Sequence, residues 1–222
     1  MARHLLEDEL KVGIVAEIGR FAALAGEVSE DDQWKLRTRF WGLAVGDVVA
    51  HVTGVLADVT SGRVTNLVTP AAVARQVIER LPVGRASLVK DLWNLQRTAE
   101  SILSTFTAES WAAPAPSGFD GTIAEAVQAI WEDIWLHADD IRSAVGAEPD
   151  LGPGLAASVY HVIGRLERSG WNGAITLDGL GEIVVGGGGR AFTADPHTFV
   201  LVATSRADPL EHALDPSLVI ET

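Results

Sequence analysis

The sequence predicts an α+β protein, in which a four-helix bundle is followed by a small C-terminal α/β domain. Before about residue 148, apolar residues recur at steps of three and four and alanine is abundant, which is typical of amphipathic helices. After it, glycine-rich turns separate short β-type runs. Three glycines and two prolines lie between residues 146 and 154 and mark the change. We therefore expect two domains, 1–148 and 149–222.

Four long helices are expected in the first domain, over residues 6–28, 45–60, 71–108 and 121–146. Pro82 cannot continue a helix from the preceding turn, so the third element is a short helix followed by a long one. Thr69 and Pro70 supply a cap and a first-turn proline, and Gly146 can close the last helix. Four amphipathic helices joined in this way form a bundle most simply.

The second domain is expected to contain a helix over 155–168 and antiparallel strands near 173–178, 181–186, 190–194 and 198–204. A short helix near 209–213 and a last strand near 218–220 complete it. The glycines at 186–189 do not open a helix and lack a trailing Lys-Ser/Thr pair. They therefore indicate a strand connection and not a phosphate-binding loop.

Charge and composition exclude several classes of function. Seventeen Lys and Arg against thirty Asp and Glu give a net charge of −13, which argues against binding to nucleic acid or to an anionic membrane. Without cysteine, the chain can form no disulfide, thiolate zinc site or cysteine nucleophile. The sequence shows no apolar run of the roughly 18–20 residues that cross a bilayer and no export signal. We therefore expect a soluble cytoplasmic protein whose metal ligands, if any, are His and carboxylates.

The segment 131–141 holds the most informative residues. At about 100° per residue, Asp133 and His137 lie about 40° apart on a helix face that also carries Ile130 and Ile141. Glu132 lies about 140° from His137 and is expected at the rim or in solvent. Burying an unpaired carboxylate is costly, so a metal ion shared by Asp133 and His137 would stabilise it. A local hydrogen bond between the two side chains is the alternative.

A third inward-facing residue strengthens the metal interpretation. His51 shares a helix face with Val48 and Val55 and so points to the same core. Two histidines and a carboxylate match the three protein ligands of a catalytic zinc or a related divalent ion, with a coordination position left open. Taken singly, His51 could instead be a hydrogen-bonded core histidine. Asp47 is expected to cap its helix, and Asp140 either orients a ligand or is a solvated last-turn acid.

Arg206 is a candidate anion-binding residue. It stands between an expected strand and an expected helix, where an arginine can bind the carboxylate of a ligand. A surface ion pair is the alternative. Four tryptophans are expected mostly in the core, and those nearest the ligands would keep the site dry: Trp34, Trp41, Trp131 and Trp135.

Several of these segments together resemble the mycothiol-dependent maleylpyruvate isomerase family, within the DinB-like superfamily of metal-binding four-helix bundles. The resemblance rests on four pieces in order: Asp31-Asp32-Gln33-Trp34, Val45 to Val52, the Asp133/His137/Asp140 spacing, and Ser205-Arg206-Ala207-Asp208-Pro209. It implies a zinc site in which His51 and His137 match the histidine ligands and Asp133 stands at a glutamate position. Arg206 matches an active-site arginine. Aspartate is one methylene shorter than glutamate, and Ala44 stands where a capping threonine is usual.

The resemblance also implies a function. The metal would activate an external low-molecular-weight thiol, mycothiol, for isomerisation of a small electrophilic acid or for transfer of the thiol to it, with Arg206 as a catalytic residue. A non-catalytic metal or small-ligand sensor on the same scaffold is the alternative, motivated by the aspartate at position 133. Proteins of the superfamily often pair, so a homodimer is one assembly open to the chain.

Overall fold

The computed structural model describes residues 5–28, 31–67 and 69–220. They form two compact units, one over residues 6–150 and one built mainly from residue 151 onward. The first is helical and the second carries a small sheet, so the fold is α+β as predicted. The expected boundary between independent domains at 148/149 stays a prediction, since compactness alone does not test independent folding.

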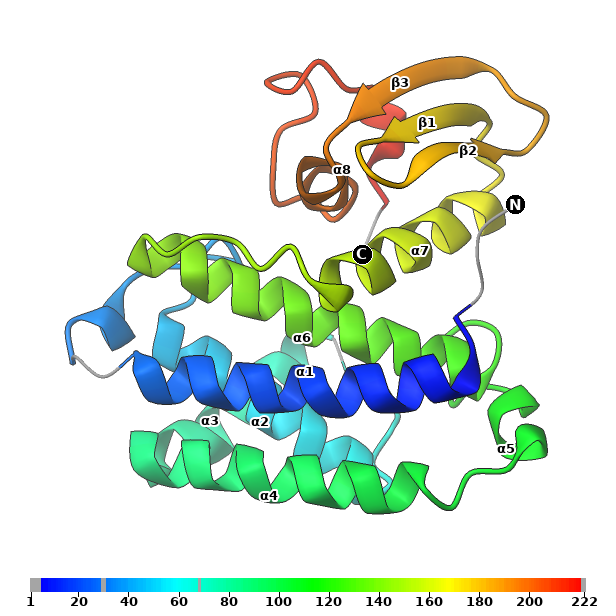
Figure 1. Ribbon diagram of the computed structural model, residues 1–222. Helices are drawn as coiled ribbons and strands as arrows, with labels where there is room; N and C mark the ends of the chain where they lie inside the picture. The colour runs from blue at the N-terminus through cyan, green and yellow to red at the C-terminus, as the bar shows by residue number, and fades with distance from the viewer. Residues whose placement is uncertain (1–4, 29–30, 68, 221–222) are drawn as a thin grey trace. The chain divides into compact units, whose positions relative to one another are not determined.

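The helical unit is a bundle of four long helices with shorter elements between them. The long helices are α1 (Glu7–Glu27), α2 (Val45–Thr60), α4 (Arg85–Leu103) and α6 (Ile123–Val145). The helices α1 and α2 each pack against both α4 and α6, so the four close around one core (Figure 1). The shorter elements are η1 (Gln33–Lys35), α3 (Pro70–Arg80), η2 (Leu81–Val83) and α5 (Ala108–Ala112). No helix among the described residues is long and apolar enough to cross a membrane.

Local signals end and begin these helices as predicted. The Thr69 hydroxyl accepts a hydrogen bond from the Ala72 amide, and Pro70 occupies the first turn of α3. The stretch around Pro82 separates α3 from α4. Gly146 closes α6 in the left-handed conformation, with φ of 73°. The period of apolar residues predicted a third helix that runs to residue 108. In the structure α4 ends at Leu103, and the short helix α5 follows it as a separate element.

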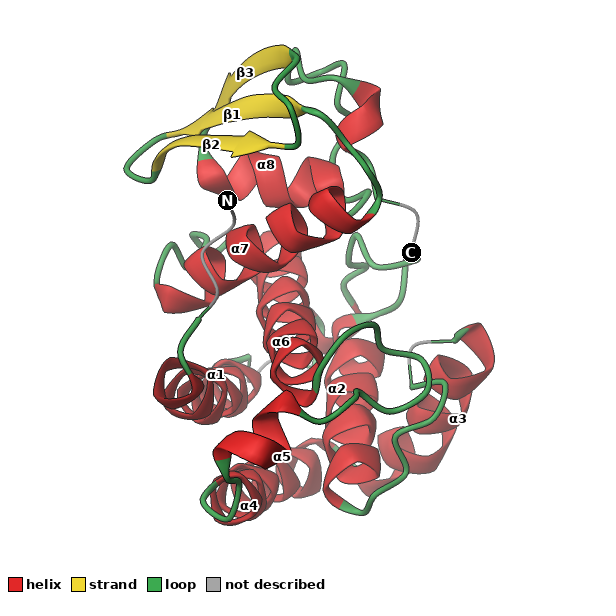
Figure 2. Ribbon diagram, turned by 90° about the vertical axis from the view of Figure 1, so that its right-hand side faces the viewer, coloured by secondary structure: helices red, strands yellow, loops and turns green. Residues whose placement is uncertain are grey.

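The C-terminal unit begins with α7 (Pro153–Arg168) and contains a three-stranded sheet. Its strands β1 (Gly173–Leu177), β2 (Gly181–Val185) and β3 (Arg190–Ala194) lie in the order β2-β1-β3. The expectation of antiparallel strands is correct for β1 and β2, but β3 runs parallel to β1. The 186–189 glycines connect β2 to β3 as predicted, and Gly186 and Gly188 take positive φ there. Figure 2 shows α7 and a second helix, α8 (Pro196–Ala203), on one face of this sheet.

The expected strand at 198–204 is wrong, because the segment forms α8 (Pro196–Ala203). The Asp195 carboxylate accepts from the Thr198 amide at 2.8 Å, and Pro196 occupies the first turn. The run from Phe199 to Ala203 is buried on every side, so its hydrophobicity carries no period that separates helix from strand. The predicted helix near 209–213 is a turn, and the predicted strand near 218–220 is replaced by η3 (Pro216–Leu218).

Candidate metal centre

The helix α6 supplies two of the predicted ligands, one turn apart. The His137 side chain is buried, whereas the Asp133 side chain is 25% exposed. His137 Nε2 lies 3.4 Å from Asp133 Oδ1. A tetrahedral zinc ion with bonds of 2.0–2.2 Å holds its donors about 3.4 Å apart. This pair therefore already has the spacing that a shared ion requires.

The helix α2 contributes His51 to the same place. His51 is buried, and its ring lies 5.0 Å from the His137 ring, centroid to centroid, at an angle of 88°. One donor atom from each of His51, Asp133 and His137 lies within 4.8 Å of the other two. Two imidazole nitrogens and one carboxylate oxygen form a donor set that suits zinc and related divalent ions. The three residues thus fit a metal ion after modest side-chain rotation.

Burial keeps His51 in the neutral form that binds metals. Desolvation, followed by the neighbouring His137, lowers the pKa of His51 to about 4, against smaller opposing effects of Asp133 and Gln76. A histidine binds a metal through the lone pair of an unprotonated nitrogen. Near pH 7 the imidazole of His51 therefore needs to lose no proton before it ligates.

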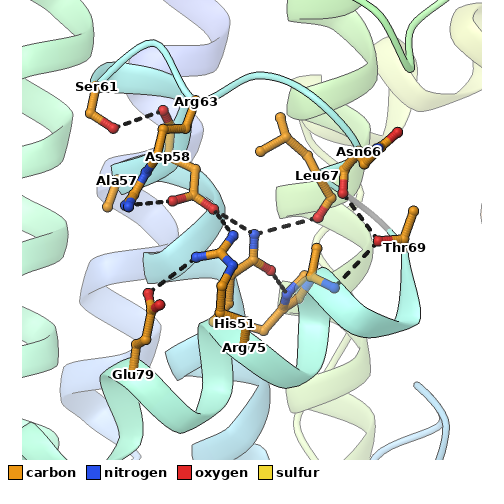
Figure 3. A network of polar contacts seen from close by, with 12 residues as sticks. His51, Ala57, Asp58, Ser61, Arg63, Asn66, Leu67, Thr69, Arg75 and Glu79 are labelled. Atoms are coloured by element: carbon orange, nitrogen blue, oxygen red, sulfur yellow. Dashed lines mark hydrogen bonds and ion pairs between the residues drawn. The ribbon is translucent and has the colours of Figure 1, made fainter.

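A buried polar network extends from His51 to α3 and to the end of α2. His51 Nδ1 lies 2.8 Å from Gln76 Oε1, and Gln76 Nε2 donates to Asp58 Oδ2 at 3.0 Å. Figure 3 shows the contacts of Asp58, whose carboxylate also pairs with Arg63 at 2.7 Å and Arg75 at 2.5 Å. Gln76 and Asp58 are almost completely buried. The network links the candidate ligand to two arginines at the surface.

Asp140 is buried beside the other histidine, so the alternative of a solvated acid is wrong. Its Oδ2 lies 3.4 Å from His137 Nδ1, on the opposite side of the ring from Asp133. The guanidinium of Arg39 lies 3.3 Å from Asp140 and 2.5 Å from Asp139 and supplies the charge that two buried carboxylates need. A carboxylate on the second ring nitrogen of a ligating histidine is a common feature of metal sites.

One aromatic ring packs against both histidines, and a second packs against the first. The Phe40 ring lies 4.4 Å from that of His137 and 5.6 Å from that of His51, and Trp41 stacks on Phe40 at 4.7 Å. The expectation that Trp41 belongs to the core is wrong: it is 59% exposed, with φ of 50°. Trp131 and Trp135 are buried as expected. Their indole nitrogens donate to Glu17 and to the Asp150 carbonyl, away from the candidate ligands.

The expectation that Glu132 lies in solvent or at the rim is also wrong, because this residue is buried. The prediction for Glu132 assumed that only one side of the helix is covered by the protein, whereas α6 packs against α1, α2 and α5. Residues at nearly every position from 130 to 141 are therefore buried. Asp47 follows its prediction and accepts a hydrogen bond from the Ala44 amide at 3.0 Å, at the start of α2.

Arg206 lies in the C-terminal unit, in the turn that follows α8. It is half-buried, and its Nη1 is 3.4 Å from the Thr204 carbonyl. The residues around it, Ser205 to Pro209 and Val219, line a shallow hollow of about 410 Å³. The catalytic role expected for Arg206 stays a prediction.

Sequence reasoning missed Gln76, Asp58, Arg39 and Phe40. Asp58 follows His51 by seven residues, two helical turns, so the shared face was a signal in the sequence. Gln76 stands on α3 and contacts His51. Phe40 and Arg39 stand in the loop before α2, where Phe40 contacts both histidines and Arg39 pairs with Asp140. No spacing within one element could have identified them.

Comparison with known proteins finds the same fold in two solved structures. Two crystal structures of a mycothiol-dependent maleylpyruvate isomerase, one of them a mutant, each align with a TM-score of 0.65 over 91% of this chain and 90% of theirs. Their sequences are 12% and 13% identical to this one, so the match shows the fold alone. The curated proteins contain no match. The model of the mycothiol maleylpyruvate isomerase N-terminal domain matches residues 14–142, more than half of the chain. The chain belongs to this family.

Proposed function

We propose that the chain binds a divalent metal ion, zinc, through His51, Asp133 and His137 and acts on a small electrophilic acid with mycothiol as thiol cosubstrate. The observation that carries the proposal is the convergence of three donor atoms within 4.8 Å from two helices. Membership of the family supports the thiol and the class of substrate.

The chain's own residues would prepare the site for this chemistry. Neutral His51 offers a lone pair, and Asp140 on the far side of the His137 ring orients that imidazole. Phe40 covers both rings and restricts the access of water. When bound, a zinc ion lowers the pKa of a thiol so that the thiolate is available at neutral pH.

The exposed fraction of Asp133 marks the side on which a cosubstrate would enter, since both histidines are buried. Arg206 would neutralise the carboxylate of the acid. Addition of the thiolate to an electrophilic carbon, rotation about the former double bond and loss of the thiol would isomerise the acid. Retention of the adduct would give S-transfer.

Metal analysis of the purified protein tests the ligand set. We expect about one zinc ion per chain in the wild type and a clear loss in His137→Ala and Asp133→Asn. The matched control is His212→Ala, which removes an exposed histidine from the C-terminal unit and should leave the metal content unchanged. Equal metal content in wild type and His137→Ala would refute the proposal.

Turnover of the zinc-loaded protein with mycothiol and an electrophilic unsaturated acid tests the chemistry. We expect thiol-dependent isomerisation or adduct formation that Arg206→Gln reduces by raising KM for the acid. The second candidate function is a non-catalytic metal or small-ligand sensor. The aspartate at position 133 favours it, because this metal ligand is one methylene shorter than the glutamate that the family resemblance implies. Tight metal and ligand binding without turnover in both wild type and Asp133→Glu would support the sensor and contradict the enzyme.

A further inference from the structure

The polar network behind His51 has a defined direction of hydrogen bonding. Asp58 sits at its centre, where its carboxylate accepts from Gln76 Nε2 and contacts the guanidinium groups of Arg63 and Arg75. Burial would raise the pKa of Asp58, but hydrogen bonds from Arg75 and Gln76 and the two positive charges bring it below its usual value. An ionised carboxylate can only accept hydrogen bonds. Its partner on Gln76 is therefore the amide NH₂ group.

This direction propagates through Gln76 to His51. The Gln76 NH₂ group faces two acceptors, Asp58 Oδ2 at 3.0 Å and the Leu67 carbonyl at 3.4 Å. The opposite end of the amide, Oε1, then faces His51 Nδ1 at 2.8 Å. A carbonyl oxygen accepts, so Nδ1 must carry the proton. In neutral His51 the lone pair is consequently on Nε2.

We propose that Gln76, oriented by Asp58, is a positioning residue that holds His51 in the Nδ1–H tautomer, so that Nε2 is ready to bind a metal ion. This inference rests on the proposed function for its purpose, although the tautomer itself is a property of the metal-free protein. Partners on the second nitrogen of a ligating histidine commonly change metal affinity by 10–100-fold.

The close packing of α3 on α2 brings Gln76 within hydrogen-bond distance of His51. Gly54 lies on α2 one turn after His51, and a Cβ atom there would be 2.6 Å from Gln76 Cβ and 3.2 Å from its Cα. Real Cβ atoms do not approach carbon so closely. A glycine at position 54 is therefore what allows α3 to pack tightly enough on α2 for the amide to reach the imidazole.

Two measurements on the full chain test the proposal. Nitrogen NMR of the metal-free protein at pH 7.5 reports the tautomer of His51, and competition with a chromogenic chelator reports its affinity for Zn²⁺. We expect the Nδ1–H tautomer in the wild type. Gln76→Met, which keeps the volume but loses the acceptor, should lose this restriction and bind Zn²⁺ about 10–100-fold more weakly.

The control and the rescue separate positioning from packing. Gln96→Met removes another glutamine of the bundle, whose Nε2 donates to the Val15 carbonyl, and should leave the Zn²⁺ affinity unchanged. The exchange Asp58→Asn with Gln76→Glu preserves the net charge and again gives Nδ1–H an acceptor, so it should restore binding close to the wild-type affinity.

A proton on His51 Nε2 in the wild type would overturn the proposal, and so would wild-type Zn²⁺ affinity in Gln76→Met. The tautomer measurement needs no variant and holds if Gln76→Met does not fold. If the wild type binds no Zn²⁺, the proposed function fails, while the tautomer still decides this inference.

Discussion

Replacement of Gly54 by alanine should destabilise the bundle and weaken its metal site together. The added Cβ would lie 2.6 and 2.7 Å from Gln76 Cβ and Cγ and 3.2 Å from its Cα, whereas favourable carbon contacts begin near 3.5 Å. Because one of these atoms belongs to the backbone, rotation of the glutamine cannot relieve the overlap. The helix α3 must move away from α2 by roughly 1 Å.

The magnitude follows from three effects. Overpacking of this kind costs about 1–3 kcal/mol, and loss of the His51–Gln76 hydrogen bond costs about 1 kcal/mol. The higher helix propensity of alanine offsets about 1 kcal/mol. The net loss of about 2 kcal/mol corresponds to a fall in Tm of about 4–8 °C for a chain of this size.

Thermal unfolding followed by circular dichroism, with Zn²⁺ competition on the same samples, measures both effects. The matched control is Gly26→Ala near the end of α1, where the nearest atom to a new Cβ is a Val89 methyl at 3.8 Å. That variant should be as stable as the wild type or up to about 1 kcal/mol more stable. If Gly54→Ala matched Gly26→Ala in stability and bound Zn²⁺ like the wild type, the close approach of α2 and α3 would not govern the site.

Three further predictions concern pH, the second histidine and α8. The pKa of His51 is lowered from 6.5 to about 4 in the folded chain, so the unfolded chain takes up this proton first as the pH falls. The free energy of unfolding that depends on neutral His51 is therefore fully present above pH 6.5 and is lost as the pH falls toward 4. Metal-free protein should lose about 2 kcal/mol between pH 7.5 and 5 through this group, measured by urea unfolding, and an equal loss in His51→Gln would contradict the assignment. Asp140→Asn should weaken Zn²⁺ binding by about 10-fold in the chelator assay, because His137 Nδ1 loses its carboxylate; unchanged affinity would show that Asp140 serves only Arg39. Asp195→Ala should cost about 1 kcal/mol by removing the cap of α8, whereas Asp195→Asn should cost much less, and equal losses in thermal unfolding would argue against capping.

Much of the fold could be predicted because its signals are local. A threonine with a proline after it begins α3, a glycine in the left-handed conformation ends α6, and the period of apolar residues marks the long helices. The run at 199–203 shows no such period, since every residue in it is buried, and the strand predicted there overlooked Asp195 and Pro196, which begin α8 as Thr69 and Pro70 begin α3. Its helical state depends on the Asp195 cap and on packing against α7.

The candidate site, too, could be predicted from the sequence only in part. The pairing of Asp133 with His137 follows from helix geometry alone, because residues four apart lie on one face. The inward direction of His51 follows from the apolar residues around it on α2. The sequence by itself therefore determined which three side chains could share an ion.

Tertiary structure alone decided what surrounds those side chains. Gln76 reaches His51 because Gly54 lets α3 approach, Arg39 reaches Asp140 across about a hundred residues of chain, and Glu132 is buried because three helices cover α6. Such contacts depend on how helices pack, which no period within one helix encodes. The tautomer of His51 and the charge balance around His137 are consequently properties of the packed bundle and not of any single segment.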